Sequence, residues 1–246
     1  MKRDAKELKV DWNSILNWKL LQGAHDFPGP DGGTCISEAA IVVAGFKYRK
    51  VASADDCPPC FSRVLTTFAI QLNDALLEDK RQELLMPFVT RLAGTADTAD
   101  IERKRFDYIM LGLIRTVLPI SLRGWQDELA VECAAIRNYD DAAIAINNIA
   151  HSFIDDFLLI DGLIPVRVRA LAQDLARAFF HYRVRAVAHG LVLALAHALN
   201  PNLTHEINIA AVTLLEGAMQ IGKQSEPIER SIVVDRLTKV RHLEHA

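Results

Sequence analysis

Apolar residues recur at helical spacing along most of this chain, and this periodicity restricts the fold more than any other feature. Three- and four-residue spacing is typical of a helix with one buried face. The segments that show it are 78–92, 98–122, 125–137, 140–159, 166–199, 204–221 and 227–243. After residue 56 no segment alternates apolar and polar residues long enough for a strand. The sequence therefore predicts an all-α fold, an irregular bundle of about nine helices.

Prolines and one glycine interrupt the helical pattern. Pro87 and Pro119 lie inside two of these segments, and we expect kinks at both, since proline lacks the backbone N–H that a helix uses. Segment 166–199 would be ~50 Å long as a straight helix. Gly190 interrupts it, which favours a long C-terminal helix that bends or protrudes at this glycine.

Residues 1–246 are most simply interpreted as a single all-α unit. We find neither an internal repeat nor a low-complexity linker. The weakest point is Gly94 to Thr98, which would separate a loop-rich N-terminal part, residues 1–94, from a helical C-terminal part, residues 98–246.

Two short helices are predicted near the N-terminus. Asp11 is the expected N-cap of the first helix, which ends at Gly23. Thr34 is the expected N-cap of the second, whose nearly continuous apolar run over residues 36–43 indicates burial before Gly45 ends it.

Charge and composition exclude several classes of partner. The chain has 28 Lys and Arg against 31 Asp and Glu, a net charge of −3, so we expect no nucleic-acid partner. His189 and His197 interrupt the most apolar tract, and residues 1–10 lack the apolar stretch of a signal peptide, so we expect no membrane association. Four cysteines in 246 residues do not resemble a secreted disulfide framework, which favours a cytoplasmic protein.

A cysteine pair, Cys57-Pro-Pro-Cys60, is the sharpest local motif. With Cys57 as a helix N-cap, both thiols would lie at the positive end of the helix dipole, which favours thiolate. Cys35 and His25 would complete the Cys3His ligand set of a structural zinc site. Ordinary reduced thiols are the favoured interpretation, and a structural zinc site, with zinc as the candidate metal, comes second. A redox disulfide comes last, because the βαβ context of thioredoxin-like proteins is absent.

Titratable residues crowd around a loop rich in glycine and proline, residues 25–33. His25, Asp26, Asp31 and Glu38 fall within fourteen residues. His25, Asp31 and Glu38 are the candidates for acid–base catalysis. The favoured alternative is structural: the aspartates bond to the turn, and Glu38 interacts with the positive end of the following helix.

A basic stretch, FFHYRVRAVAH at residues 179–189, is the candidate partner-binding segment. Arg183, Arg185 and His189 would contact an acidic partner, or the arginines would simply solvate one helix face. The chain carries no GxxxxGK, GxGxxG, GxSxG or HExxH motif, so the common nucleotide-binding, hydrolase and zinc-protease signatures are absent.

Several motifs within residues 25–120 resemble a family of bacterial and bacteriophage proteins to which no activity is attached. The shared pattern is an FP-x-P loop, a Gly-x-Cys-x-x-Glu-Ala helix start, a cysteine pair and an Asn-Asp that ends the next helix. Here it comprises Phe27, Pro28, Pro30, Gly33, Cys35, Glu38, Ala39, Cys57, Cys60, Asn73 and Asp74. The resemblance implies that residues 25–74 form one structural unit. It also implies a small accessory protein of a mobile element that binds host machinery, antagonists of host defence included.

Two functions from different classes follow. The first is a non-enzymatic helical protein-interaction module that binds a protein partner through an exposed helix face. The alternative is a metal-assisted enzyme with a site in residues 25–60, in which Glu38 or His25 is the general base. The apolar content of the last three helices also permits a homo-oligomer.

Overall fold

The computed structural model describes residues 18–26, 33–124, 126–138, 141–142, 144–145, 190, 192–194, 196–197, 200–226 and 228–242. These residues form an all-α fold with eight α-helices and one pair of two-residue strands, which confirms the predicted class. The elements are β1 (Lys19–Leu20), β2 (Gly33–Thr34), α2 (Ile36–Val43), η1 (Ala54–Asp56), α3 (Arg63–Ala75), α4 (Glu78–Val89), α5 (Ala99–Gly112), η2 (Leu113–Val117), α6 (Leu118–Leu122), α7 (Asp127–Ala135), η5 (Pro201–Leu203), α11 (Thr204–Met219) and α12 (Arg230–His242).

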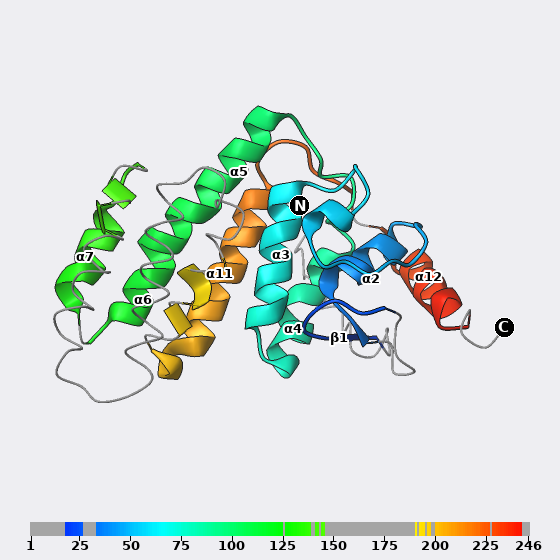
Figure 1. Ribbon diagram of the computed structural model, residues 1–246, viewed down its shortest axis with the longest axis horizontal. Helices are drawn as coiled ribbons and strands as arrows, with labels where there is room; N and C mark the ends of the chain where they lie inside the picture. Colours follow the sequence, from blue (N-terminus) through cyan, green and yellow to red (C-terminus); the bar gives the residue numbers. More distant parts are fainter. Residues whose placement is uncertain are drawn as a thin grey trace, which may run out of the picture.

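The helices form a row that runs from α7 at one end of the molecule to α2 and α12 at the other (Figure 1). In between, α11 packs against α3 and α5, while α12 packs against α2. The buried apolar residues form one connected core. Both predicted parts of the chain, residues 1–94 and 98–246, contribute to it.

The stretch Gly94 to Thr98, which separates these two parts, is hydrogen-bonded to neighbouring residues. Thr95 is buried, and its Oγ1 accepts the Ser62 N–H at 3.1 Å. The Ala96 N–H donates to the Cys60 carbonyl at 3.0 Å. The stretch between α4 and α5 is therefore held by the turn that precedes α3.

The first predicted helix is wrong over its described residues. Lys19–Leu20 form a strand parallel to Gly33–Thr34, and residues 11–17 lie outside the described part of the chain. The Gln82 side chain on α4 satisfies the extended backbone, since it accepts the Leu20 N–H at 2.9 Å and donates to the Trp18 carbonyl at 2.9 Å. Trp18 and Leu20 are buried and Lys19 is exposed, which is the period of a strand.

Two predicted N-caps are also wrong. Thr34 belongs to β2, and Cys35 caps α2 instead. Cys57 lies in a turn ahead of α3, whose N-cap is Ser62. Ser62 Oγ accepts the Leu65 N–H at 3.2 Å and donates to Glu102 at 2.8 Å. A serine hydroxyl is a stronger cap than a thiol, and α5 fixes its position through Glu102.

Both prolines at which kinks are predicted, Pro87 and Pro119, lie in helices of the structure. Pro87 is in the last turn of α4. Pro119 is the second residue of α6, directly after a π-helical turn, η2, in which the Leu118 N–H donates to the Leu113 carbonyl. The irregularity predicted at Pro119 thus takes the form of a π-helical turn. Most of the predicted long helix over residues 166–199 lies outside the described residues. Among the described helices, none has the length and apolar character of a membrane span.

One fully buried cation, Arg105, joins two stretches of backbone that lie far apart in the sequence. The Arg105 guanidinium on α5 donates to the carbonyls of Thr95, Ile221 and Lys223 at 2.6, 2.9 and 2.9 Å, and to Glu102 at 2.8 Å. Arg105 therefore ties the loop after α11 to the stretch between α4 and α5.

We predict that Arg105→Met lowers the free energy of unfolding by about 3–5 kcal/mol, because removing one partner of a buried charged network leaves the other groups unpaired. Urea denaturation measures the change. Arg103→Met is the matched control, since Arg103 is 66% exposed and pairs with Asp100 on the surface; we expect a change within about 0.5 kcal/mol. Equal effects of the two substitutions would contradict the role of Arg105.

Candidate functional site

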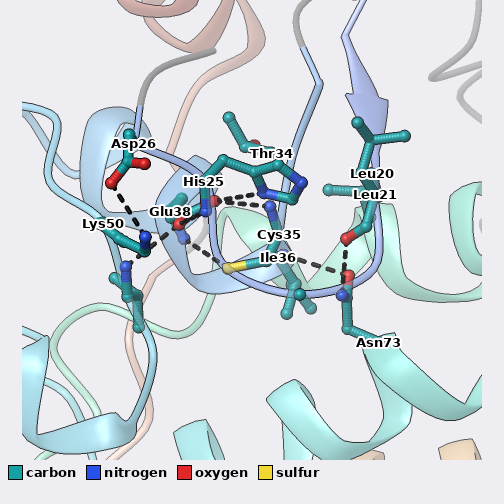
Figure 2. A network of polar contacts seen from close by, with 12 residues as sticks. Leu20, Leu21, His25, Asp26, Thr34, Cys35, Ile36, Glu38, Lys50 and Asn73 are labelled. Atoms are coloured by element: carbon teal, nitrogen blue, oxygen red, sulfur yellow. Dashed lines mark hydrogen bonds and ion pairs between the residues drawn. The ribbon is translucent and has the colours of Figure 1, made fainter. Parts of the chain in front are cut away.

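The Glu38 carboxylate lies at the centre of a buried polar cluster (Figure 2). Its side chain is fully buried. Oε1 accepts the backbone N–H groups of His25 at 2.7 Å and Val51 at 3.1 Å. Oε2 accepts the Cys35 N–H at 2.8 Å and lies 3.1 Å from His25 Nδ1. A single side chain thus binds three separate stretches of backbone.

The position of Glu38 in the helix explains this arrangement. Glu38 is the third residue of α2, and it forms a capping box with Cys35, whose Sγ accepts the Glu38 N–H at 3.4 Å. The first turn of a helix presents N–H groups without partners in the helix and carries the positive end of the dipole. An ionised carboxylate accepts but does not donate, so it suits a position surrounded by donors.

A buried asparagine on α3 extends the cluster. Asn73 Oδ1 accepts the Ile36 N–H at 3.2 Å, at the start of α2, and Nδ2 donates to the Leu21 carbonyl at 2.8 Å. The neighbouring Asp74 accepts the Gly23 N–H at 2.8 Å. The end of α3 therefore holds both the start of α2 and the segment after β1. Sequence reasoning did not assign Asn73 to the site; its signal is the Asn-Asp that ends the helix.

His25 lies at the edge of the cluster. Its side chain is 22% exposed, with Nδ1 against Glu38. Its carbonyl accepts the Tyr48 hydroxyl at 3.0 Å; burial, followed by the charge of Glu38, raises the pKa of that hydroxyl far above its usual value. When Nδ1 donates to Glu38, Nε2 of the neutral ring carries the lone pair. A carboxylate that orients an imidazole in this way is found in proton-transfer and metal sites.

The catalytic candidates have different outcomes. The structure brings His25 and Glu38 together, while Asp31 lies outside the described residues. Asp26 pairs with Lys50 at 2.9 Å on the surface. The geometry of Glu38 matches the structural interpretation of the sequence, in which this carboxylate interacts with the start of the helix.

The predicted zinc ligands are not assembled in this structure. Cys35 Sγ caps α2, and the backbone turn at Cys57 and Cys60 precedes α3. Within the described residues, which include all four candidates His25, Cys35, Cys57 and Cys60, no three His, Cys, Asp or Glu side chains form a group able to hold a metal ion. These residues do not fit the Cys3His set as placed, and zinc binding stays a prediction for elemental analysis.

Burial controls the chemistry of the cysteines. It raises the pKa of the Cys57 and Cys133 thiols to about 12. Burial, followed by the charge of Glu38, also raises the pKa of the Cys35 thiol well above its usual value. The expectation that a helix start favours a Cys57 thiolate is wrong, because Cys57 is not at a helix start and is removed from water. At neutral pH these three thiols stay protonated.

The predicted partner-binding residues Arg183, Arg185 and His189 lie outside the described residues. Comparison with known proteins adds no assignment: no protein-family model, curated protein or solved structure matches the chain. The resemblance to bacterial and bacteriophage proteins stays a prediction.

We predict that Glu38→Gln lowers the free energy of unfolding by about 2–3 kcal/mol, because the amide would direct N–H groups at buried N–H donors. Guanidinium denaturation measures the change. The control is Asp26→Asn, since Asp26 is 89% exposed in its ion pair; we expect a change within about 0.5 kcal/mol. A Glu38→Gln protein as stable as the control would show that the carboxylate is not an anchor.

We predict that iodoacetamide labels Cys60 before the other three cysteines of the native protein. Cys60 is half-buried, whereas Cys35, Cys57 and Cys133 are buried. Since the pKa of Cys57 and Cys133 is raised to about 12, their labelling stays slow as the pH rises from about 7 to 9, the range over which an ordinary thiol ionises. Peptide mass spectrometry gives the order of labelling. Denatured protein is the control, in which all four react; fast native labelling of Cys57 would contradict the prediction.

Proposed function

We propose that this chain is a non-enzymatic protein-interaction module. The observation that carries the proposal is how the molecule uses Glu38. Both oxygens of this fully buried carboxylate accept hydrogen bonds from the chain's own backbone. A catalytic carboxylate has to reach a substrate, a water or a metal. Glu38 instead anchors the backbone of residues 25, 35 and 51, and both of its oxygens are hydrogen-bonded inside the fold.

The surface supports the same proposal. Val131 and Ile144 are 69% and 62% exposed. Covering apolar side chains of this size by a partner is favourable, at about 25 cal/mol for each Å² removed from water. The buried Cys57 and Cys133 thiols, by contrast, are held in the protonated form, which is a poor nucleophile.

The biological role extends this proposal through the family resemblance. Bacteriophage members suggest a mobile-element accessory protein whose partner is a host complex, a defence complex among them. This role is supported by the resemblance. The contacts and exposed side chains of the molecule support only the proposal that it binds a partner.

A metal-assisted enzyme in residues 25–60 is the second candidate, and one observation favours it. The half-buried His25 imidazole is oriented by Glu38 at 3.1 Å, as an imidazole base or metal ligand is. Because Glu38→Gln disturbs the fold, it does not separate the two functions. His25→Asn does, since the amide can keep a donor toward Glu38 while the basic nitrogen is lost.

We predict that His25→Asn leaves partner binding intact. The tagged full chain, wild type or variant, is purified from cells that carry its gene and run on a gel-filtration column. We expect both to elute with one partner protein in a fixed ratio, and urea denaturation checks that the variant is folded. If the wild type elutes with no protein in a fixed ratio, the interaction module is excluded. If it turns over a substrate and a folded His25→Asn does not, the enzyme is the function.

A further inference from the structure

Helix α7 lies at one end of the molecule (Figure 1), and apolar side chains are exposed in this region. Cys133 and Ile136 are buried beneath α7, which packs on α6 and η2. Val131 and Ile144 point outward, 69% and 62% exposed. Among the described residues of this region, these two large apolar side chains have the highest exposed fractions.

The face is hollowed. A surface hollow of about 400 Å³ is lined by Glu132, Ala135, Ile136, Asp141, Ile144 and Ala145. Val131 lies one helical turn before Ala135, so the two share a side of α7. Ile144 and the alanines make the hollow apolar, and Val131 adds an exposed apolar side chain on the same side of α7. An apolar hollow on a helix surface can take the apolar side chains of an amphipathic helix.

The rim of the hollow is acidic. Glu132 and Asp141 belong to its lining, and Glu128 precedes Glu132 by one turn on α7. Among the described residues of 126–145, four are acidic and one, Arg137, is basic. Like charge disfavours a polynucleotide here, and it disfavours a symmetric contact with a second copy, which would place this rim against itself. Charge complementarity selects a basic occupant.

We propose that the α7 hollow, defined by the six lining residues together with Val131, binds an amphipathic helix of a partner protein. The apolar stripe of that helix covers Val131 and Ile144, and its Lys or Arg side chains lie against Glu132 and Asp141. This inference rests on the proposed interaction function and names the surface and the chemistry of the partner.

The first test uses a synthetic amphipathic helix with Leu and Ala on one face and Lys on both flanks, and the same peptide with Glu in place of Lys. Fluorescence anisotropy with the full chain gives the Kd. We expect the Lys peptide to bind and the Glu peptide to bind at least about tenfold more weakly. The double variant Val131→Ser, Ile144→Ser should raise the Kd for the Lys peptide by about tenfold or more. Leu77→Ser is the control, an equally exposed leucine between α3 and α4, and should leave the Kd unchanged.

Three results overturn the inference: equal binding of the two peptides, an unchanged Kd in the double variant, or an equal loss in Leu77→Ser. Sedimentation of the wild type adds a fourth, since self-association that the double variant abolishes would make a second copy the occupant. The double variant is then taken through the gel-filtration experiment. Loss of the natural partner supports the α7 hollow as its site. A retained partner overturns this inference and leaves the interaction function standing, whereas a wild type without any partner overturns the proposed function itself.

Discussion

The buried Glu38 carboxylate is the interaction on which the N-terminal half of this molecule depends. All eight residues of α2 are buried, so the N–H groups at the start of this helix have no water to bind. Leaving such donors unpaired costs roughly 1–3 kcal/mol each. Glu38 accepts the Cys35 N–H at the helix start together with those of His25 and Val51, and Asn73 accepts that of Ile36. Because these N–H groups have partners, α2 can be buried in the fold even though the start of the helix is polar.

The other end of α2 is closed by a residue far along the chain. Arg236 on α12 donates to the Val43 carbonyl, and its guanidinium packs against Gly45, which has a φ of +90°. A cation at a helix C-terminus is favourable, and glycine adopts this backbone conformation without strain. The polar groups at both ends of α2 are therefore engaged inside the fold, and the proposed interaction function is placed at the surface instead, where Val131 and Ile144 are exposed.

Much of the fold could be predicted from the sequence, and particular residues show why the rest could not. The periodicity of residues 204–221 predicts α11 to within a few residues, because the pattern comes from one buried face. The helix predicted up to Gly23 is wrong because Gln82, some sixty residues away, pairs with the backbone at Trp18 and Leu20. The prediction of Cys57 as an N-cap was wrong because the Ser62 hydroxyl is a stronger acceptor than a thiol, and Glu102 holds this hydroxyl in place. In the candidate site, the crowding of His25 and Glu38 was visible. Asn73 had a signal in the Asn-Asp that ends its helix, but nothing local linked it to Glu38, and Val51 carried no local signal.

By itself, the sequence determined the all-α class, most helix positions within the described residues and the burial of α2, because hydrophobic periodicity and the preferences of proline and glycine act within a few residues. Only the tertiary structure decided what each buried polar group does. Whether Glu38 meets substrate or backbone, and whether Cys35, Cys57 and Cys60 converge, depends on segments that the chain brings together from far apart. Desolvation makes those pairings obligatory, since a buried donor or carboxylate has to find its partner wherever the fold places one.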